Sequence, residues 1–456
     1  MKSKISLILA ASALILSVLA CTVSPRPTRT PVVNPPTQPP VTQPPSDAIQ
    51  IVSTTSFTDQ YGYFYIVGEI VNNSEVALNY IELQVQAQDA NGNSVLKDMD
   101  GNPIEFDTIY PILSVLQPGG SSPFAYYFDT QTYGVPSTYD VQVSSYETTD
   151  IQAAEWGVEN VQMIDGGDGY LYLSGELVNK TSQWIYIEDL AGGALDDSDK
   201  VLSADEVLDY ASLLAPAGDS EGLDRTPFAI SFPYPPGDVT QWGVWGSVQV
   251  YDGTDPYTSL DPVVNFMYFD DYGAIHMVGY VTNTGSETVH TAVVGGFYAE
   301  DGTCLDASFT SLPYSVQPGQ SVPFDISYFS NVNYNEEQAN LIDTFTVQLD
   351  YWSTYAPIYN EVMLTSPDVT VEKDGASWTV SGTFTNSSDK NLVDVVVVVT
   401  VYEGENLVGV GYAYVYPATD YYAPSATDAF EINLFLDPTL DLTNSQIEVT
   451  VVGEFE

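Results

Sequence analysis

A short pattern, Gly-x-apolar-x-Asn followed closely by Ser or Thr, occurs four times in this chain of 456 residues. The copies read VGEIVNNSE, LSGELVNKTSQ, MVGYVTNTGSE and VSGTFTNSSDK, and their glycines are Gly68, Gly175, Gly279 and Gly382. Successive glycines are 107, 104 and 103 residues apart, which is the length of one small domain. The repeat therefore predicts four tandem copies of a single domain.

Two further markers follow each copy in the same order. The first is a Pro-rich turn that ends in a phenylalanine, as in SVLQPGGSSPF, and these phenylalanines are Phe124, Phe228, Phe324 and, in a weaker copy, Phe430. The second is a closing run that alternates apolar and polar residues, such as TYDVQVSSY. Alternation with period two is typical of strands that bury one face. Around the four glycines it predicts these inward residues: Phe64, Ile66 and Ile70; Leu171, Leu173 and Leu177; Ile275, Met277 and Val281; Trp378, Val380 and Phe384.

The four repeated glycines have the same inward parity as these apolar residues. A glycine weakens a strand interior unless a bulge or a close neighbour needs the space. We therefore expect a bulky residue of the facing sheet, the phenylalanine of the Pro-rich turn, to lie over each glycine.

The repeated asparagines, Asn72, Asn179, Asn283 and Asn386, come where each of these strands should end. Asparagine, glycine and serine favour turn geometry through short side-chain hydrogen bonds to the backbone. All of these asparagines except Asn283 also match the N-glycosylation signal. Because a turn explains four copies and glycosylation explains three, we interpret the motif as the corner of a hairpin.

Together the markers predict about seven short strands in each hundred residues and an all-β fold of four tandem immunoglobulin-like or fibronectin-like β-sandwiches. The expected boundaries are 49–150, 151–254, 255–356 and 364–456. One segment of the second copy, DSDKVLSADEVLDYASLL, has helix-like spacing, and we interpret it as a local insertion.

Residues 1–21 have the layout of a secretory signal peptide, with Lys2 and Lys4 before an apolar run that ends at Ala20 and Cys21. Its last four residues, Val-Leu-Ala-Cys, resemble the lipobox of bacterial lipoproteins, which implies cleavage before Cys21 and a diacylglycerol on its thiol. Residues 22–48 are rich in proline and threonine and predict an extended spacer. We therefore expect a secreted protein that the lipid on Cys21 anchors to the membrane, at the outer face of the cell envelope.

The charge of the chain is strongly acidic, with 61 Asp and Glu against 10 Lys and Arg and a formal net charge of −51. A surface of that sign repels phosphate backbones, so we expect no nucleic-acid partner. The excess is compatible with solubility, with attraction of cations or with a habitat of high salt.

The inventory of chemically active residues gives no catalytic constellation. The two histidines, His276 and His290, are expected on adjoining strands of the third copy, where they are either a metal-binding or pH-sensing pair or ordinary surface residues. Cys304 is expected to be a structural thiol. No pair of carboxylates stands out as an acid and base, so we predict that the chain is not an enzyme and has no cofactor.

Calcium is the one ion that the composition favours, because oxygen ligands occur at alternate positions in three acidic turns. The candidate ligands are Asp89, Asn91 and Asn93; Asp98, Asp100 and Asn102; Asp196, Asp197 and Asp199. The same residue types also build ordinary hairpin turns, and both readings stay open.

Exposed aromatic side chains are the last signal. Tyr63 with Tyr65, and Tyr170 with Tyr172, recur as Tyr-x-Tyr on the outward faces of two predicted strands. Tyrosine is frequent where sugars or proteins dock, and cross-strand tyrosine pairs also stabilise sheets that bind nothing. These four residues are the candidate binding face.

The order of the motifs resembles the FxLYD-type domain of bacterial and archaeal surface lipoproteins. The matching segments are Gly68 to Asn72 with Gln117 to Phe124, and Gly279 to Asn283 with Gln317 to Phe324. The resemblance implies an extracytoplasmic β-sandwich and no catalytic residue. We expect a structural or adhesive module that binds protein or polysaccharide; the alternative is a surface lipoprotein that captures a solute or processes carbohydrate.

Overall fold

The computed structural model describes residues 48–253, 259–333, 335–355, 360–365, 367–440 and 442–455. All of them belong to one compact unit, Pro45–Glu456. The predicted signal peptide with Cys21, and the predicted linker apart from Ala48, lie outside the described residues. Among the described residues, no helix is both long and apolar enough to cross a membrane.

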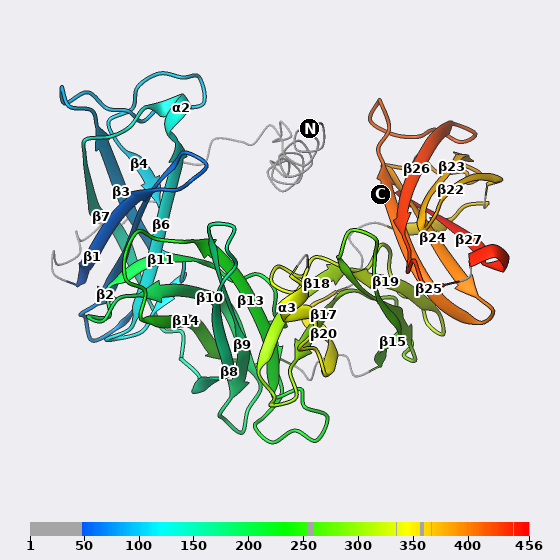
Figure 1. Cartoon of the computed structure of the whole chain (residues 1–456), viewed down its shortest axis with the longest axis horizontal. Helices are drawn as coiled ribbons and strands as arrows, with labels where there is room; N and C mark the ends of the chain where they lie inside the picture. The colour runs from blue at the N-terminus through cyan, green and yellow to red at the C-terminus, as the bar shows by residue number, and fades with distance from the viewer. Residues whose placement is uncertain are drawn as a thin grey trace, which may run out of the picture. The chain divides into compact units, whose positions relative to one another are not determined.

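The strands form antiparallel sheets that follow one another in pairs along the chain, and each pair encloses a hydrophobic core. We call these pairs sandwiches 1 to 4. Sandwich 1 combines the sheet β1 (Ile49–Thr58), β2 (Tyr63–Asn72) and β6 (Ser121–Asp129) with the sheet β3 (Ala77–Gln88), β4 (Asp107–Ile109), β5 (Val115–Leu116) and β7 (Thr138–Thr149) (Figure 1). Sandwich 2 combines β8 (Trp156–Asp165), β9 (Tyr170–Asn179) and β13 (Arg225–Pro233) with β10 (Ile185–Leu195), β11 (Val201–Glu206), β12 (Leu213–Leu214) and β14 (Gln241–Val250).

The other two sandwiches repeat this order. Sandwich 3 combines β15 (Leu260–Phe269), β16 (Ile275–Asn283) and β19 (Ser321–Ile326) with β17 (His290–Tyr298), β18 (Cys304–Ser311) and β20 (Thr344–Tyr355). Sandwich 4 combines β22 (Val369–Asp374), β23 (Ser377–Thr385) and β26 (Thr427–Phe435) with β21 (Asn360–Met363), β24 (Asp394–Glu403), β25 (Asn406–Val415) and β27 (Gln446–Phe455). The short helices are α2 (Thr130–Tyr133), α3 (Glu336–Ala339) and η1 (Leu442–Asn444). The predicted all-β architecture of tandem β-sandwiches is confirmed, while the domain boundaries stay a prediction.

The predicted inward residues around each glycine are all buried, none exposing more than 8% of its surface. The phenylalanines also lie over the glycines, since Phe124, Phe228, Phe324 and Phe430 are the cross-strand partners of the four glycines. The expected sheet was wrong, however. Each phenylalanine comes from the neighbouring strand of the same sheet and covers the glycine sideways, because the Pro-rich turn feeds directly into the strand that pairs with the glycine strand.

The repeated asparagines do lie at turns, but the expected hairpins were wrong, because each turn joins strands of two opposite sheets, as from β2 to β3. Asn72 is fully buried, and its Nδ2 donates to the carbonyl oxygens of Val76 at 2.8 Å and Leu116 at 2.9 Å. Its Oδ1 accepts from the backbone N–H and the hydroxyl of Ser74. Asn179, Asn283 and Asn386 make the equivalent two donations. Each asparagine therefore ties its own turn to a segment more than 30 residues away.

The interpretation of the segment with helix-like spacing as a local insertion was also wrong. Its residues Val201–Glu206 form strand β11, which pairs with β10 as β18 pairs with β17 and β25 with β24. It is therefore a regular part of the repeat and neither a helix nor an insertion. The spacing misled because β11 buries residues on both faces, so its apolar positions do not alternate.

The strands β11, β18 and β25 share a second role, because each packs against the first sheet of the preceding sandwich. Val201 and Ala204 of β11 lie in one apolar cluster with Val67 of β2. The carbonyl oxygen of Cys304, at the start of β18, accepts a hydrogen bond from the Ser174 hydroxyl of β9 at 2.7 Å. Val410 of β25 belongs to the same apolar cluster as Val278 of β16. One face of the repeat thus receives the same strand of the next repeat three times.

Candidate functional site

Tyrosines from two sandwiches meet where the β1–β2 turn lies beside the β8–β9 turn. The rings of Tyr63 and Tyr65 are 6.0 and 5.4 Å from that of Tyr127 on the neighbouring strand β6, and the ring of Tyr61 is 6.2 Å from that of Tyr170. We call these five residues the tyrosine cluster. Three of the four predicted binding-face residues belong to it. Tyr172 does not, since its hydroxyl donates to Asp168 at 2.7 Å.

A cleft of about 320 Å³ lies beside the tyrosine cluster. Gln60 and Gly169 contribute to its lining, each next in sequence to a tyrosine of the cluster. The backbone N–H of Tyr234 donates to the carbonyl oxygen of Gly169 at 2.8 Å, which holds the third segment of the cleft in place. The full lining is Thr58, Asp59, Gln60, Gly169, Tyr234, Pro235, Pro236 and Gly237.

Asp59 organises this region electrostatically. Its Oδ1 accepts the backbone N–H groups of Tyr61 and Tyr63 at 2.9 and 2.8 Å, while its Oδ2 is buried without a hydrogen-bond partner among the described residues. Burial first, and then the charge of Asp59, raise the pKa values of Tyr65 and Tyr170. The phenols of Tyr65 and Tyr170 therefore stay neutral at physiological pH, and the site offers aromatic faces, hydroxyl groups and a carboxylate.

Tyr61, Tyr127 and Tyr234 were missed by the sequence reasoning. Tyr61, Tyr127 and Tyr234 expose 55, 58 and 41% of their surface, each more than Tyr63, which at 40% is the most exposed of the predicted residues. One signal was available. Once Gly68 is paired with Phe124, the register places Tyr127 opposite Tyr65, which links the two aromatic runs.

The predicted calcium ligands lie in three separate turns that are closed by their own first aspartate. Asp89 Oδ1 accepts the backbone N–H groups of Asn91 and Asn93, and Asp98 Oδ1 does the same for Asp100 and Asn102. Asp196 Oδ1 accepts from Ser198 and Lys200. Hydrogen bonds from Asn93, Asn102 and Ser198 lower the pKa values of the three aspartates. In the described part of the chain, no three His, Cys, Asp or Glu side chains are grouped to hold a metal. Calcium binding stays a prediction.

The two histidines are not on adjoining strands, which corrects that expectation. His276 is the second residue of β16, the central strand of its sheet, whereas His290 begins β17 in the opposite sheet. Nδ1 of His276 is 2.8 Å from Asp325 and its ring stacks on Tyr268 at 4.8 Å. Burial would lower the pKa of His276, but Asp325 and Asp270 outweigh it and raise the pKa to about 9. The turn after Asn283 carries the chain from one sheet to the other, so the two histidines lie in different sheets.

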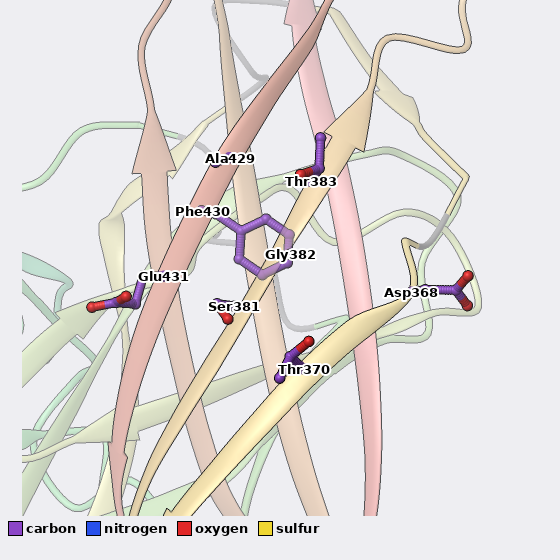
Figure 2. A pocket seen from close by; sticks show the side chains of 8 residues that line it. All are labelled: Asp368, Thr370, Ser381, Gly382, Thr383, Ala429, Phe430 and Glu431. Carbon is purple, nitrogen blue, oxygen red and sulfur yellow. The ribbon is translucent and has the colours of Figure 1, made fainter.

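The first sheet of sandwich 4 has an open outer face with a groove of about 770 Å³. Figure 2 shows Thr370 on β22, Ser381 and Thr383 on β23, and Glu431 on β26 around this groove, with the Phe430 ring lying across Gly382. Their side chains are hydroxyls and carboxylates, so the face is polar. It is the counterpart of the face that the next sandwich covers in sandwiches 1 to 3.

Buried carboxyl groups predict how stability depends on pH. Burial raises the pKa values of Asp209, Asp306 and Glu454 to about 7. Since unfolded carboxyls titrate near 4, the folded chain binds more protons between about pH 4 and 7, and its stability falls as pH rises through that window. The His276 contribution is present below its unfolded pKa and is lost as pH rises toward 9.

We therefore expect the melting temperature of residues 48–456 to decrease steadily from about pH 5 to about pH 9, as measured by calorimetry. Glu454→Gln should flatten the part of this profile below neutral pH. Glu448→Gln, on the same strand β27, is the matched control. A melting temperature that rises with pH across this range would contradict the assignment.

Comparisons with known proteins give no family for this chain. No family model matches it, and no curated protein matches it. Among solved structures, the C-terminal globular domain of an oligosaccharyltransferase from Pyrococcus abyssi is 9% identical, with 63% of this chain and 75% of that chain covered and a TM-score of 0.13. The α-2-macroglobulins of E. coli and Salmonella are 9% and 8% identical, with TM-scores of 0.11 and 0.12. They cover 88% of this chain, which spans 28% and 29% of their own lengths. Such likenesses carry no argument about function.

Proposed function

We propose that this chain is a non-catalytic binding protein displayed outside the cell and anchored by a lipid on Cys21. The pattern of residues 1–21 supports export and lipidation. The Pro-rich spacer, at ~3.1 Å per residue, could hold the sandwiches up to roughly 75 Å from the membrane. We also propose membership of the FxLYD-type family, which the fourfold glycine, phenylalanine and asparagine motif supports.

The proposed binding site is the tyrosine cluster with its cleft, and the proposed ligand class is a polysaccharide without negative charge. One observation carries this proposal: Tyr61, Tyr63 and Tyr127 expose large parts of their rings beside a cleft that contains Asp59 and Gln60. Aromatic faces pack on the apolar faces of sugar rings, while carboxylate and amide groups bond sugar hydroxyls. The net charge of −51 disfavours anionic polymers.

The raised pKa of Asp306 does not indicate catalysis, because this carboxyl group has a structural role. Asp306 is fully buried, and its Oδ2 accepts the backbone N–H groups of Asn331 and Val332 at 2.6 and 2.9 Å. It therefore holds the chain after β19 and does not line the cleft. A general acid must reach its substrate, so Asp306 acts on structure and not on a ligand.

Binding of residues 48–456 to an array of neutral and amino-sugar polysaccharides tests the proposal. Tyr61→Ala and Tyr63→Ala should each weaken binding about tenfold, since each removes a packed ring worth roughly 1 kcal/mol or more. Tyr328→Ala, which removes a still more exposed tyrosine from sandwich 3, should bind like the unchanged protein. Capture of a protein partner with an affinity that neither cluster variant changes would contradict the proposed site.

A further inference from the structure

At each of the three junctions between successive sandwiches, the same strand of one sandwich packs on the same face of the sandwich before it. One such face, in sandwich 4, and one such strand, in sandwich 1, are left without a junction. The face is the outer side of the first sheet, and the strand is the one that follows the central strand of the second sheet. β11, β18 and β25 of sandwiches 2 to 4 are buried against the preceding sandwich. Within the described chain, therefore, no following sandwich covers the face of sandwich 4, and strand β4 of sandwich 1 covers no preceding sandwich.

The face of sandwich 4 resembles a face that is already occupied. Ser381 stands directly before Gly382, as Ser174 stands before Gly175 in sandwich 2. Ser174 is 1% exposed, and its hydroxyl donates to the carbonyl oxygen of Cys304 in the incoming strand β18. In sandwich 4 the Ser381 position lies in the open groove of Figure 2, flanked by Thr370 and Glu431. A polar face of this kind can thus receive an edge strand through its carbonyl groups.

Exposed aromatic residues flank the unused strand of sandwich 1 on both sides. β4 pairs with β3 as β11 pairs with β10, so it occupies the same place in the fold. Ile109 of β4 is buried in the core, which directs Phe106 and Tyr110 to the opposite side. These two residues expose 41 and 61% of their surface. In the other sandwiches the corresponding strand is covered at this side.

We propose that a second copy of this chain completes the pattern, its β4 strand with Phe106 and Tyr110 packing on the Ser381, Thr383 and Glu431 face of sandwich 4. The contact is head-to-tail, so it uses two different surfaces and leaves one of each free on the resulting pair. The contact between two chains would then repeat the junction that already joins successive sandwiches within one chain. Both surfaces carry acidic residues, including Glu431 and Glu105, so repulsion between copies opposes the contact and salt strengthens it.

Sedimentation of residues 48–456 over a range of concentrations, at low and high salt, tests the proposal. We expect association that increases with concentration and with salt, and that does not stop at a dimer. Ser381→Glu and Tyr110→Ser should each abolish most of the association between chains. Ser387→Glu, an exposed serine beyond the end of β23, and Tyr328→Ser in sandwich 3 are the matched controls and should associate normally.

A mixture of the two variants makes the test specific. Ser381→Glu keeps an intact β4 surface and Tyr110→Ser keeps an intact sandwich 4 face, so the mixture should form a dimer and nothing longer. A chain that stays monomeric at every concentration and salt level would overturn the proposal. So would Ser381→Glu protein that associates as strongly as its Ser387→Glu control.

Discussion

Replacing Gly279 with alanine should destabilise sandwich 3 by about 3 kcal/mol or more, because the new methyl group has no room. A Cβ on Gly279 would lie 2.1 Å from the carbonyl oxygen of Val263 and 2.7 Å from the Phe324 ring. Val263 lies beside a β-bulge, since β15 shifts register between Val264 and Phe266 where it pairs with Gly279 and Val278. The glycine is thus required by a bulge on one side and a ring on the other.

Gly175→Ala is the informative comparison, since its obstacles are side chains alone. A Cβ there would meet Val161 at 2.8 Å and Phe228 at 3.0 Å, and no backbone atom is among its nearest neighbours. We expect a smaller loss of unfolding free energy, part of which Phe228→Leu should restore. In the Gly279→Ala protein, Phe324→Leu should restore little, because the Val263 carbonyl remains. Calorimetric melting of residues 48–456 measures all four variants; equal losses at the two glycines would refute this account.

The fold was largely predictable from the sequence, because apolar residues recur at alternate positions around each of the four glycines. The inward set around Ile66, Leu173, Met277 and Val380 needed only a period of two. What the period cannot tell is which strands are neighbours. The phenylalanine over each glycine was therefore identified correctly but assigned to the wrong sheet.

Segments that bury both faces were the least predictable. Val201 and Ala204 of β11 pack on the preceding sandwich while other residues of the same strand face their own core, so the apolar pattern loses its period and imitates a helix. The candidate site was hard to predict for the same reason, because it depends on packing between sandwiches. Tyr63 and Tyr170 were recognisable one by one, but their meeting depends on a contact between sandwiches that no local pattern encodes.

Replacing Asn179 with alanine should lower the free energy of unfolding of sandwich 2 by about 4 kcal/mol, more than a substitution at an exposed position would. Asn179 is fully buried; its Nδ2 donates to the carbonyl oxygens of Gln183 at 2.8 Å and Ala215 at 2.6 Å, and its Oδ1 accepts from Thr181. Alanine leaves the buried carbonyl oxygen of Ala215 and the backbone N–H of Thr181 without these partners, each costing about 1 to 3 kcal/mol, while the Gln183 carbonyl oxygen keeps the Thr181 hydroxyl. Asn73→Ala, in the same type of turn but exposed, should change little.

Asn179→Asp separates the hydrogen bonds from the shape of the side chain. The carboxylate would face the carbonyl oxygens of Gln183 and Ala215 with no proton to donate, so we expect a loss at neutral pH at least as large as that of alanine. In acid, a protonated carboxyl can donate to one of them and should recover part of the stability. The same geometry bears on glycosylation, because both hydrogens of Nδ2 are engaged and the atom is buried in the folded chain. Mass spectrometry of the exported protein should therefore find Asn179 without a glycan, and a glycan there on a chain that melts normally would show that the asparagine is not the structural tie we describe.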